Sequence, residues 1–185
     1  MTQNSFTCEL PPDYVQALES MAADAELSVP QMLRMLIREA QALRHPAKFL
    51  PMLPLSENSP KQVIVLRKDL NMRKGKMVSQ GAHASWAALL ENASFDAGLQ
   101  SVTFRLGEAE WNWLASGHFK KICVSVNSEE ELFGIHRQAK LAGLPCKLIQ
   151  DSGLTEFKEP TFTALAVGPG WPQEVDAITG GLPLL

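Results

Sequence analysis

The chain is organised around residues 61–86, KQVIVLRKDLNMRKGKMVSQGAHASW. The segment opens with an apolar, largely β-branched run at residues 63–66, which predicts a buried strand. A strongly cationic turn follows, and the sequence predicts a helix from about residue 76 to residue 90. A strand, a basic turn and a helix in this order are typical of an α/β domain with a polar site where the strand ends.

Three polar side chains of this predicted helix, Lys76, Gln80 and His83, are spaced at i, i+4 and i+7 and share one face. The turn before them adds four more cations, Arg67, Lys68, Arg73 and Lys74. A cation, an amide and an imidazole beside a basic turn predict a site for an anionic substrate. The spacing alone leaves an alternative open, namely a solvated turn followed by a structural histidine.

Strands and helices alternate along the rest of the chain. Strands are predicted at residues 121–126, 146–150 and 162–167, the last one ending at Gly168. Helices are predicted at 108–115, 129–141 and 172–178, and residues 92–100 are predicted to be a loop. We therefore predict an α/β fold with a small mixed sheet of about four strands and helices on both of its faces.

A second polar cluster follows the predicted strand 146–150. Asp151 begins it, Thr155 lies four residues further on, and Thr163 falls in the next strand. A carboxylate directly after a buried strand lies at the edge of the sheet where α/β proteins form their sites. The alternative is an aspartate that only initiates a turn before Ser152 and Gly153.

Residues 1–60 predict a separate small module and a tether. Residues 5–10 alternate like a short strand, and two helices follow, one starting at Pro11–Asp13 and one with Ser28 as its N-cap. One strand and two helices are too small to bury their own apolar faces. Residues 45–60 carry four prolines and predict an extended linker.

Composition and net charge limit the classes of function that this chain can have. The net charge is −3, so contact with nucleic acid requires a local basic patch. Three cysteines without metal-type spacing, Cys8, Cys123 and Cys146, are expected to be small core residues in a reducing compartment. Without a bilayer-spanning apolar run, the chain is expected to be cytoplasmic, with no membrane contact.

The organising segment resembles the signature of type II peptidyl-tRNA hydrolases. The resemblance rests on Arg67-x-Asp69-Leu70-x-Met72-x-Lys74-Gly75-Lys76-x-x-x-Gln80-x-x-His83-Ala84. It continues through SEEEL at 128–132, LPCKLIQDSG at 144–153, TALAVGP at 163–169 and ITGGLPLL at 178–185, and so covers residues 61–185. The chain departs from the family pattern at Gly81, Leu154 and Glu156, where the family commonly has cysteine, arginine and glutamine.

The resemblance implies hydrolysis of the ester bond between a peptide, or an N-blocked amino acid, and the 3′-terminal ribose of tRNA. It implies a substrate, peptidyl-tRNA, and no cofactor or metal. The catalytic set that it implies is Lys74, Asp151, Thr155 and Thr163, with His83 as an alternative base to Asp151; the tRNA-binding set is Arg67, Lys68, Arg73, Lys76 and Gln80. An alternative function is a weak or inactive hydrolase-like protein that regulates through nucleic-acid binding.

The N-terminal segment resembles ribbon-helix-helix modules, which form dimers by pairing their strands. We therefore predict three parts: a dimerisation module at 1–44, the linker at 45–60 and the hydrolase-like domain at 61–185. In such modules the outward strand residues, here Ser5, Thr7 and Glu9, contact DNA. The first sixty residues carry four Lys and Arg against seven Asp and Glu, which favours a homodimer over DNA binding.

Overall fold

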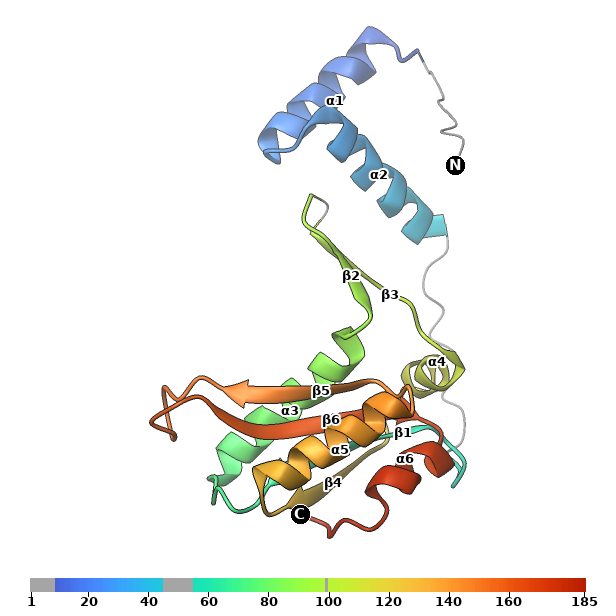
Figure 1. Cartoon of the computed structure of the whole chain (residues 1–185). Helices are drawn as coiled ribbons and strands as arrows, with labels where there is room; N and C mark the ends of the chain where they lie inside the picture. The colour runs from blue at the N-terminus through green and yellow to red at the C-terminus, as the bar shows by residue number, and fades with distance from the viewer. Residues whose placement is uncertain (1–8, 45–54, 99) are drawn as a thin grey trace. The chain divides into compact units, whose positions relative to one another are not determined.

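The computed structural model describes residues 9–44, 55–98 and 100–185. These residues belong to two compact units. The first contains α1 (Pro12–Asp24) and α2 (Val29–Arg44), together with residues 95–101. The second contains all the remaining residues from 55 onward, and it holds the four-stranded sheet (Figure 1).

The sheet of the second unit is mixed, with the strand order β4-β1-β6-β5. Its central strands are β1 (Lys61–Arg67) and β6 (Thr161–Gly170), and its outer strands are β4 (Lys121–Val126) and β5 (Cys146–Asp151). β1 runs parallel to β4, and β6 runs antiparallel to both β1 and β5. The predicted small mixed sheet of about four strands is confirmed.

Helices cover both faces of this sheet, as predicted. In β1, Val63 and Val65 point to a core shared with α5 (Glu129–Leu141) and α6 (Pro172–Thr179). The alternate residues Ile64 and Leu66 point to a second core, which α3 (Lys74–Leu90) completes. Figure 1 shows α3 and α5 on opposite sides of the sheet. Successive residues of β1 therefore point alternately into the two cores, which is why its apolar run is continuous.

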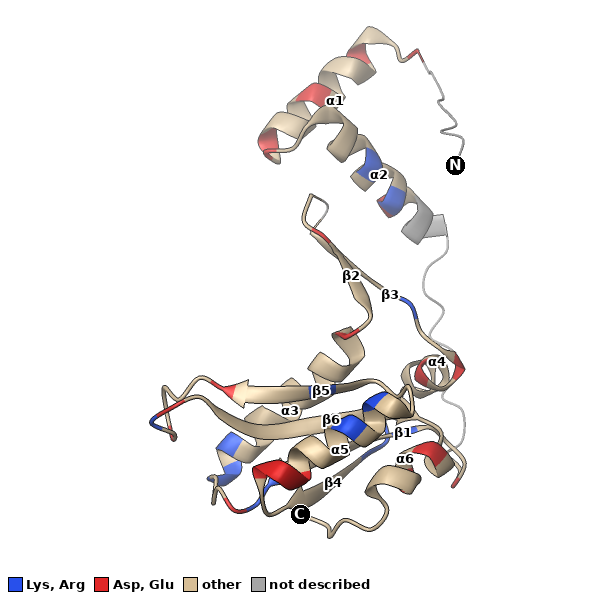
Figure 2. Cartoon of the chain, viewed as in Figure 1, with Lys and Arg blue, Asp and Glu red and all other residues tan. Residues whose placement is uncertain are grey.

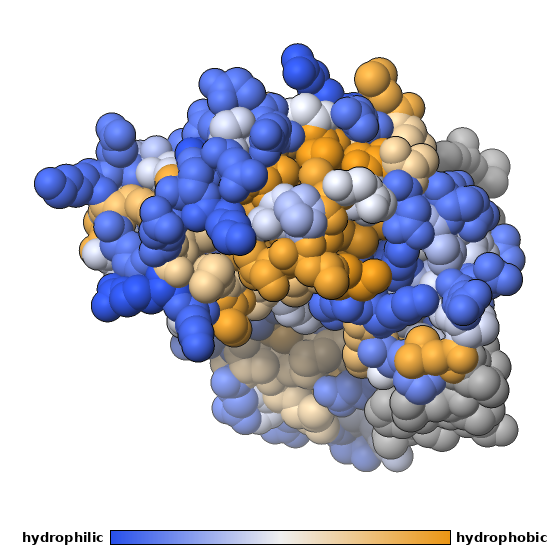
Figure 3. All heavy atoms as spheres, turned by 90° about the horizontal axis from the view of Figure 1, so that it is seen from below, coloured by the Kyte–Doolittle hydropathy of each residue, from blue (hydrophilic) through white to orange (hydrophobic). Residues whose placement is uncertain are grey.

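α3 lies mainly over β5 and β6, so part of β1 and β4 is not covered on that face. An apolar depression of about 450 Å³ forms there, lined by Ile64, Val78, Trp86, Cys123 and Leu185 among others. Figure 3 shows an apolar area ringed by hydrophilic residues on the face that carries β4 and the C-terminus. Cys123 is exposed here, so the expectation that it is a core residue was wrong; Cys146 is fully buried, as expected.

Boundaries of α3 and β6 differ from the predictions. α3 begins at Lys74 because the carbonyl of Arg73 already accepts a helical hydrogen bond from Met77. β6 continues through Gly168 to Gly170, because Gly170 pairs with Lys61 of β1. Gly168 has φ +88°, and a Cβ there would lie 2.8 Å from the Lys61 carbonyl oxygen, so this close pairing requires glycine.

The prediction of a loop at residues 92–100 was wrong. Instead, β2 (Ala93–Asp96) and β3 (Ser101–Phe104) pair into a two-stranded sheet. The strands are ASFD and SVTF, and an alternation over only four residues does not distinguish a strand from a loop, so the pairing partner decides the strand. The predicted helix 108–115 is present as α4 (Glu108–Ala115), and its Trp113 is buried.

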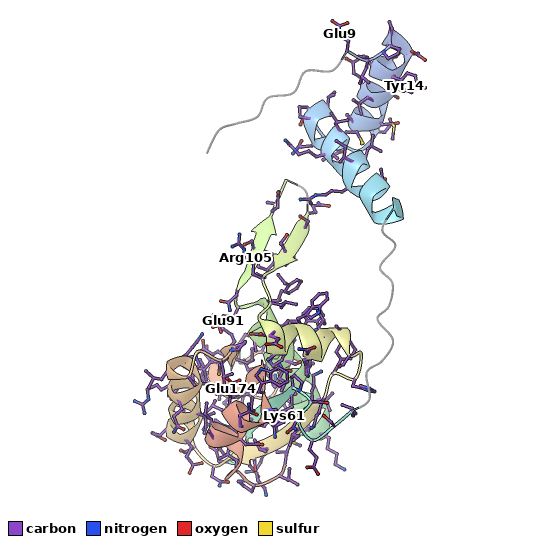
Figure 4. All side chains as sticks on the ribbon, turned by 90° about the vertical axis from the view of Figure 1, so that its right-hand side faces the viewer. Glu9, Tyr14, Lys61, Glu91, Arg105 and Glu174 are labelled. Atoms are coloured by element: carbon purple, nitrogen blue, oxygen red, sulfur yellow. The ribbon has the colours of Figure 1, made fainter. Side chains whose placement is uncertain are left out.

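In the first unit, both predicted helices form, and Met32 of α2 and Ala22 of α1 are buried. Tyr14, labelled in Figure 4, is exposed. Most of the predicted strand at 5–10 lies outside the described residues, as does most of the linker. Among the described helices, none is long and apolar enough to cross a membrane.

Candidate active site

The carboxylate of Asp151, the last residue of β5, is the centre of a polar cluster. Its Oδ2 atom accepts hydrogen bonds from the Lys76 ammonium and from Gln80 Nε2, the latter at 3.0 Å. Its Oδ1 atom accepts the backbone N–H of Gly153 at 3.0 Å. Lys76 and Gln80 reach the carboxylate together because they lie one turn apart on α3, which packs over β5.

This cluster is shielded from water and electrostatically paired. The side chains of Lys76 and Asp151 are only 12% and 10% exposed. The hydrogen bond from Lys76 is the main cause that lowers the pKa of Asp151, and the bonds from Gly153 and Gln80 act in the same direction. Asp151 is therefore a carboxylate at neutral pH and holds the Lys76 ammonium in a fixed position.

Two threonine hydroxyls complete the cluster. Thr155 Oγ1 accepts a hydrogen bond from Lys76 Nζ at 2.9 Å. Thr163 is fully buried in β6 and donates from Oγ1 to Gln80 Oε1 at 2.6 Å. Gln80 thus links Thr163 to Asp151, and this fixes the orientation of its amide group. The structure brings together Asp151, Thr155 and Thr163 of the predicted catalytic set, with Lys76 and Gln80 of the predicted binding set.

The side chains of Lys74 and His83 make no hydrogen bond or ion pair with the described residues of this cluster. Lys74 is exposed at the first position of α3, and its side chain makes no ion pair or hydrogen bond with any described residue. His83 is also exposed, on the same helical stripe as Lys76, with Nε2 3.3 Å from Ser79 Oγ. The lysine that contacts Asp151 is therefore Lys76, two residues after the one that the sequence analysis placed in the catalytic set.

The other predicted tRNA-binding cations differ in whether acidic side chains already pair with them. The Arg67 guanidinium donates to Asp69, to Glu129 and to the Phe162 carbonyl, and its side chain is only 11% exposed. The hydrogen bond that Arg67 donates to Asp69 is the main cause that raises the pKa of the guanidinium. Lys68 is exposed. Figure 2 shows Lys and Arg residues gathered where α3 begins and acidic residues where β5 ends.

Arg73 is exposed, but it forms an ion pair with Glu156. Glu156 Oε1 accepts from Arg73 Nε at 2.7 Å, and Oε2 accepts the backbone N–H of Arg73 at 3.2 Å. The hydrogen bond from the guanidinium lowers the pKa of Glu156. The acid that departs from the family pattern is therefore neutralised by a neighbouring cation.

Sequence reasoning missed two contributors to this site, the backbone N–H of Gly153 and the Arg73–Glu156 pair. The Ser-Gly turn after Asp151 was a signal for the first, because such turns return a backbone N–H to the aspartate side chain. No sequence signal connects Arg73 to Glu156, which are 83 residues apart. Among the described residues no group of His, Cys, Asp and Glu side chains could hold a metal ion.

The cluster combines a fixed cation, a carboxylate and hydroxyl groups at one end of a small mixed α/β sheet. Such groups can orient a water molecule and stabilise an oxyanion, which is the requirement for ester hydrolysis. The fold and the site together define a small α/β enzyme of the hydrolase class.

Comparison with known proteins identifies the family. Residues 60–185 match the family model described as peptidyl-tRNA hydrolase PTH2. A peptidyl-tRNA hydrolase of Methanocaldococcus jannaschii is 45% identical over 125 residues, 68% of this chain and 99% of the relative. Those of Methanopyrus kandleri and Thermococcus onnurineus are 41% and 40% identical over 125 and 127 residues, 68% of this chain and 97% of each relative. The chain belongs to the peptidyl-tRNA hydrolase family PTH2.

Proposed function

We propose that residues 60–185 hydrolyse the ester bond that joins a peptide, or an N-blocked amino acid, to the 3′-terminal ribose of tRNA. Water attacks the ester carbonyl, the bond to the ribose oxygen breaks, and a peptide and a reusable tRNA are released. The single observation that carries the proposal is the contact of Lys76, Gln80 and Asp151 in one shielded cluster. A tRNA substrate implies that the protein acts in the cytoplasm.

Lys76 supplies the positive charge of the site. Attack on the ester places negative charge on the carbonyl oxygen, and a preorganised cation stabilises that charge more strongly in a shielded site than in water. Asp151 and Thr155 hold the ammonium from two sides, so the cation does not need to reorganise during the reaction. Thr163 fixes Gln80, which in turn keeps the carboxylate in place.

Asp151 and His83 are the two candidate bases, and their surroundings differ. The pKa of Asp151 is lowered by its hydrogen bonds, which makes the carboxylate a weak proton acceptor but a good hydrogen-bond acceptor for a water molecule. We therefore assign water orientation to Asp151. His83 is accessible on the same stripe of α3, and imidazole is the common proton acceptor near neutral pH. We assign the proton-accepting role to His83.

The exposed cations contact the tRNA. Lys68 and Lys74 are exposed at the end of the sheet where Asp151 lies, and both are free to bind phosphate groups. Arg67 is held by Asp69 and Glu129 and so supports the turn instead. Because these contacts involve phosphates, we expect binding to depend little on tRNA sequence.

The two lysines of the motif offer a matched test with full-length protein. The assay follows release of an N-acetylated amino acid from charged tRNA, and it separates kcat from KM. Lys76→Met is expected to lower kcat by at least about tenfold, the scale of one lost transition-state interaction. Lys74→Met is expected to raise KM and leave kcat nearly unchanged. No release by the wild-type protein, together with binding of random DNA in a gel shift, would instead support the regulatory alternative.

We also propose that residues 1–44 form a homodimer in the manner of ribbon-helix-helix modules. Leu33 and Ile37 of α2 are 43% and 49% exposed, and Val15 of α1 is exposed as well. Two short helices that leave such residues uncovered gain stability from a second copy. DNA binding is not favoured, because the module is acidic.

Sedimentation of the full-length protein tests this dimer. The wild type is expected to sediment as a dimer and the double variant Leu33→Lys/Ile37→Lys as a monomer. Glu39→Lys, an exposed change on the same helix, is the matched control and keeps the dimer. A wild-type monomer at micromolar concentration contradicts the proposal.

A further inference from the structure

The segment between β5 and β6 is held by contacts with the end of β5 and with α3. Gly153 donates its N–H to Asp151, and Phe157 packs into the core under α3. Between these two points lie Thr155, whose hydroxyl contacts Lys76, and Glu156. Thr155 itself is exposed, so its position depends on the residues on either side of it.

Glu156 contacts the start of α3 through two hydrogen bonds. Its carboxylate accepts both the side chain and the backbone N–H of Arg73, the N-cap residue of the helix. An anion at this position also interacts favourably with the positive end of the helix dipole. The Glu156 side chain is only 15% exposed, whereas that of Arg73 is 80% exposed, so the acid is the enclosed partner.

We infer that Glu156 is a positioning residue, whose ion pair with Arg73 holds the Thr155 hydroxyl against Lys76. This inference rests on the proposed function, because its kinetic consequence is a change in ester hydrolysis. Glu156 contacts Arg73 at the start of α3, and Lys76 lies within the first turn of the same helix. The pair therefore ties the loop to the same helical turn that carries the cation of the site.

A positioning role predicts an effect on kcat and not on substrate binding. Glu156→Ala is expected to lower kcat about fivefold, since an ion pair with one exposed partner contributes modestly. KM is expected to stay the same or fall, because an acid near the phosphate contacts is removed. Glu156→Gln keeps an acceptor for the N–H groups of Arg73 and is expected to restore most of the rate.

Glu159→Ala is the matched control. Glu159 is an exposed acid on the same loop, and its side chain makes no hydrogen bond or ion pair within the described parts of the chain. The double variant Arg73→Ala/Glu156→Ala tests the coupling, because its loss of kcat is expected to be smaller than the sum of the losses in the two single variants. Equal losses for Glu156→Ala and Glu159→Ala, or additive losses in the double variant, overturn the inference.

A second measurement does not depend on activity. Hydrogen exchange of the full-length protein reports opening of residues 152–159. Glu156→Ala is expected to speed exchange in this segment at least about threefold, while Glu159→Ala leaves it unchanged. Unchanged exchange in Glu156→Ala overturns the positioning role. If the wild type hydrolyses no ester but hydrogen exchange of residues 152–159 changes as expected, the proposed function fails and the structural role of the pair stands.

Discussion

Replacing Asp151 by asparagine removes the charge at the centre of the cluster with almost no change in shape. The two carboxylate oxygens accept three hydrogen bonds, from Lys76, Gln80 and the Gly153 N–H. An asparagine offers one oxygen and one NH₂ group. In either orientation the NH₂ group faces at least one N–H donor, so at least one bond is lost and the bond from Lys76 loses its ionic partner.

The cost follows from these contacts. A hydrogen bond to a charged group contributes about 1.5–3 kcal/mol, and loss of one such bond together with weakening of the Lys76 pair gives about 2–3 kcal/mol. If the cluster acts in the transition state, kcat falls about 30- to 140-fold, since each 1.4 kcal/mol corresponds to a factor of ten.

The same substitution has a pH signature in stability. The pKa of Asp151 is lowered in the folded protein, so its contribution is fully present above the pKa of the unfolded carboxyl, about 4. That contribution is lost as pH falls through the lower folded-state pKa. We expect the difference in unfolding free energy between wild type and Asp151→Asn to have its largest value at pH 7 and to decrease below about pH 4.

The assays are release of an N-acetylated amino acid from tRNA and denaturant unfolding at a series of pH values. Asp176→Asn is the control, because Asp176 forms another aspartate–lysine pair, with Lys61 Nζ at 2.6 Å. Figure 4 labels Lys61, which lies at the start of β1. The control is expected to keep wild-type kcat. Wild-type turnover by folded Asp151→Asn would refute the catalytic role of the cluster, and a pH-independent stability difference would refute the charge argument.

Three further predictions test other parts of the domain. Gly81→Ala in α3 is expected to raise the unfolding free energy by about 0.5–1 kcal/mol, because the added Cβ lies 3.5 Å from its nearest neighbour and helix propensity improves; thermal unfolding checks this. Gly153→Ala is expected to lower the melting temperature and kcat together, because Gly153 has φ +79° and a Cβ there would lie 2.6 Å from a backbone carbon of Glu159. In peptide mapping after brief alkylation at pH 8, we expect modification at the exposed Cys123 and not at Cys146, whose pKa burial raises to about 12. A destabilised Gly81→Ala, an unaltered Gly153→Ala or fast labelling of native Cys146 would contradict these expectations.

The sequence predicted correctly the features that depend on a local pattern of residues. The apolar run of β1 predicted a buried strand, because a strand buried on both faces needs no polar alternation. The helix predicted at 129–141 forms as α5, and Ser128 caps its start, with Oγ accepting the Glu131 N–H at 3.1 Å. The stripe of Lys76 and Gln80 correctly predicted that these side chains point the same way, because helical spacing is a property of the chain alone.

Tertiary structure decided which groups meet. Lys74 and Lys76 are both lysines in one motif, and only the packing of α3 over β5 brings Lys76, and not Lys74, to Asp151. The ion pair between Arg73 and Glu156 likewise depends on a contact between segments that are 83 residues apart. By itself the sequence determined the strands and helices of the α/β domain and the residues its site could draw on, because these follow from local periodicity. The folded structure alone decided the partner of the carboxylate, because a contact across 75 residues is fixed by how helix and sheet pack and not by spacing along the chain.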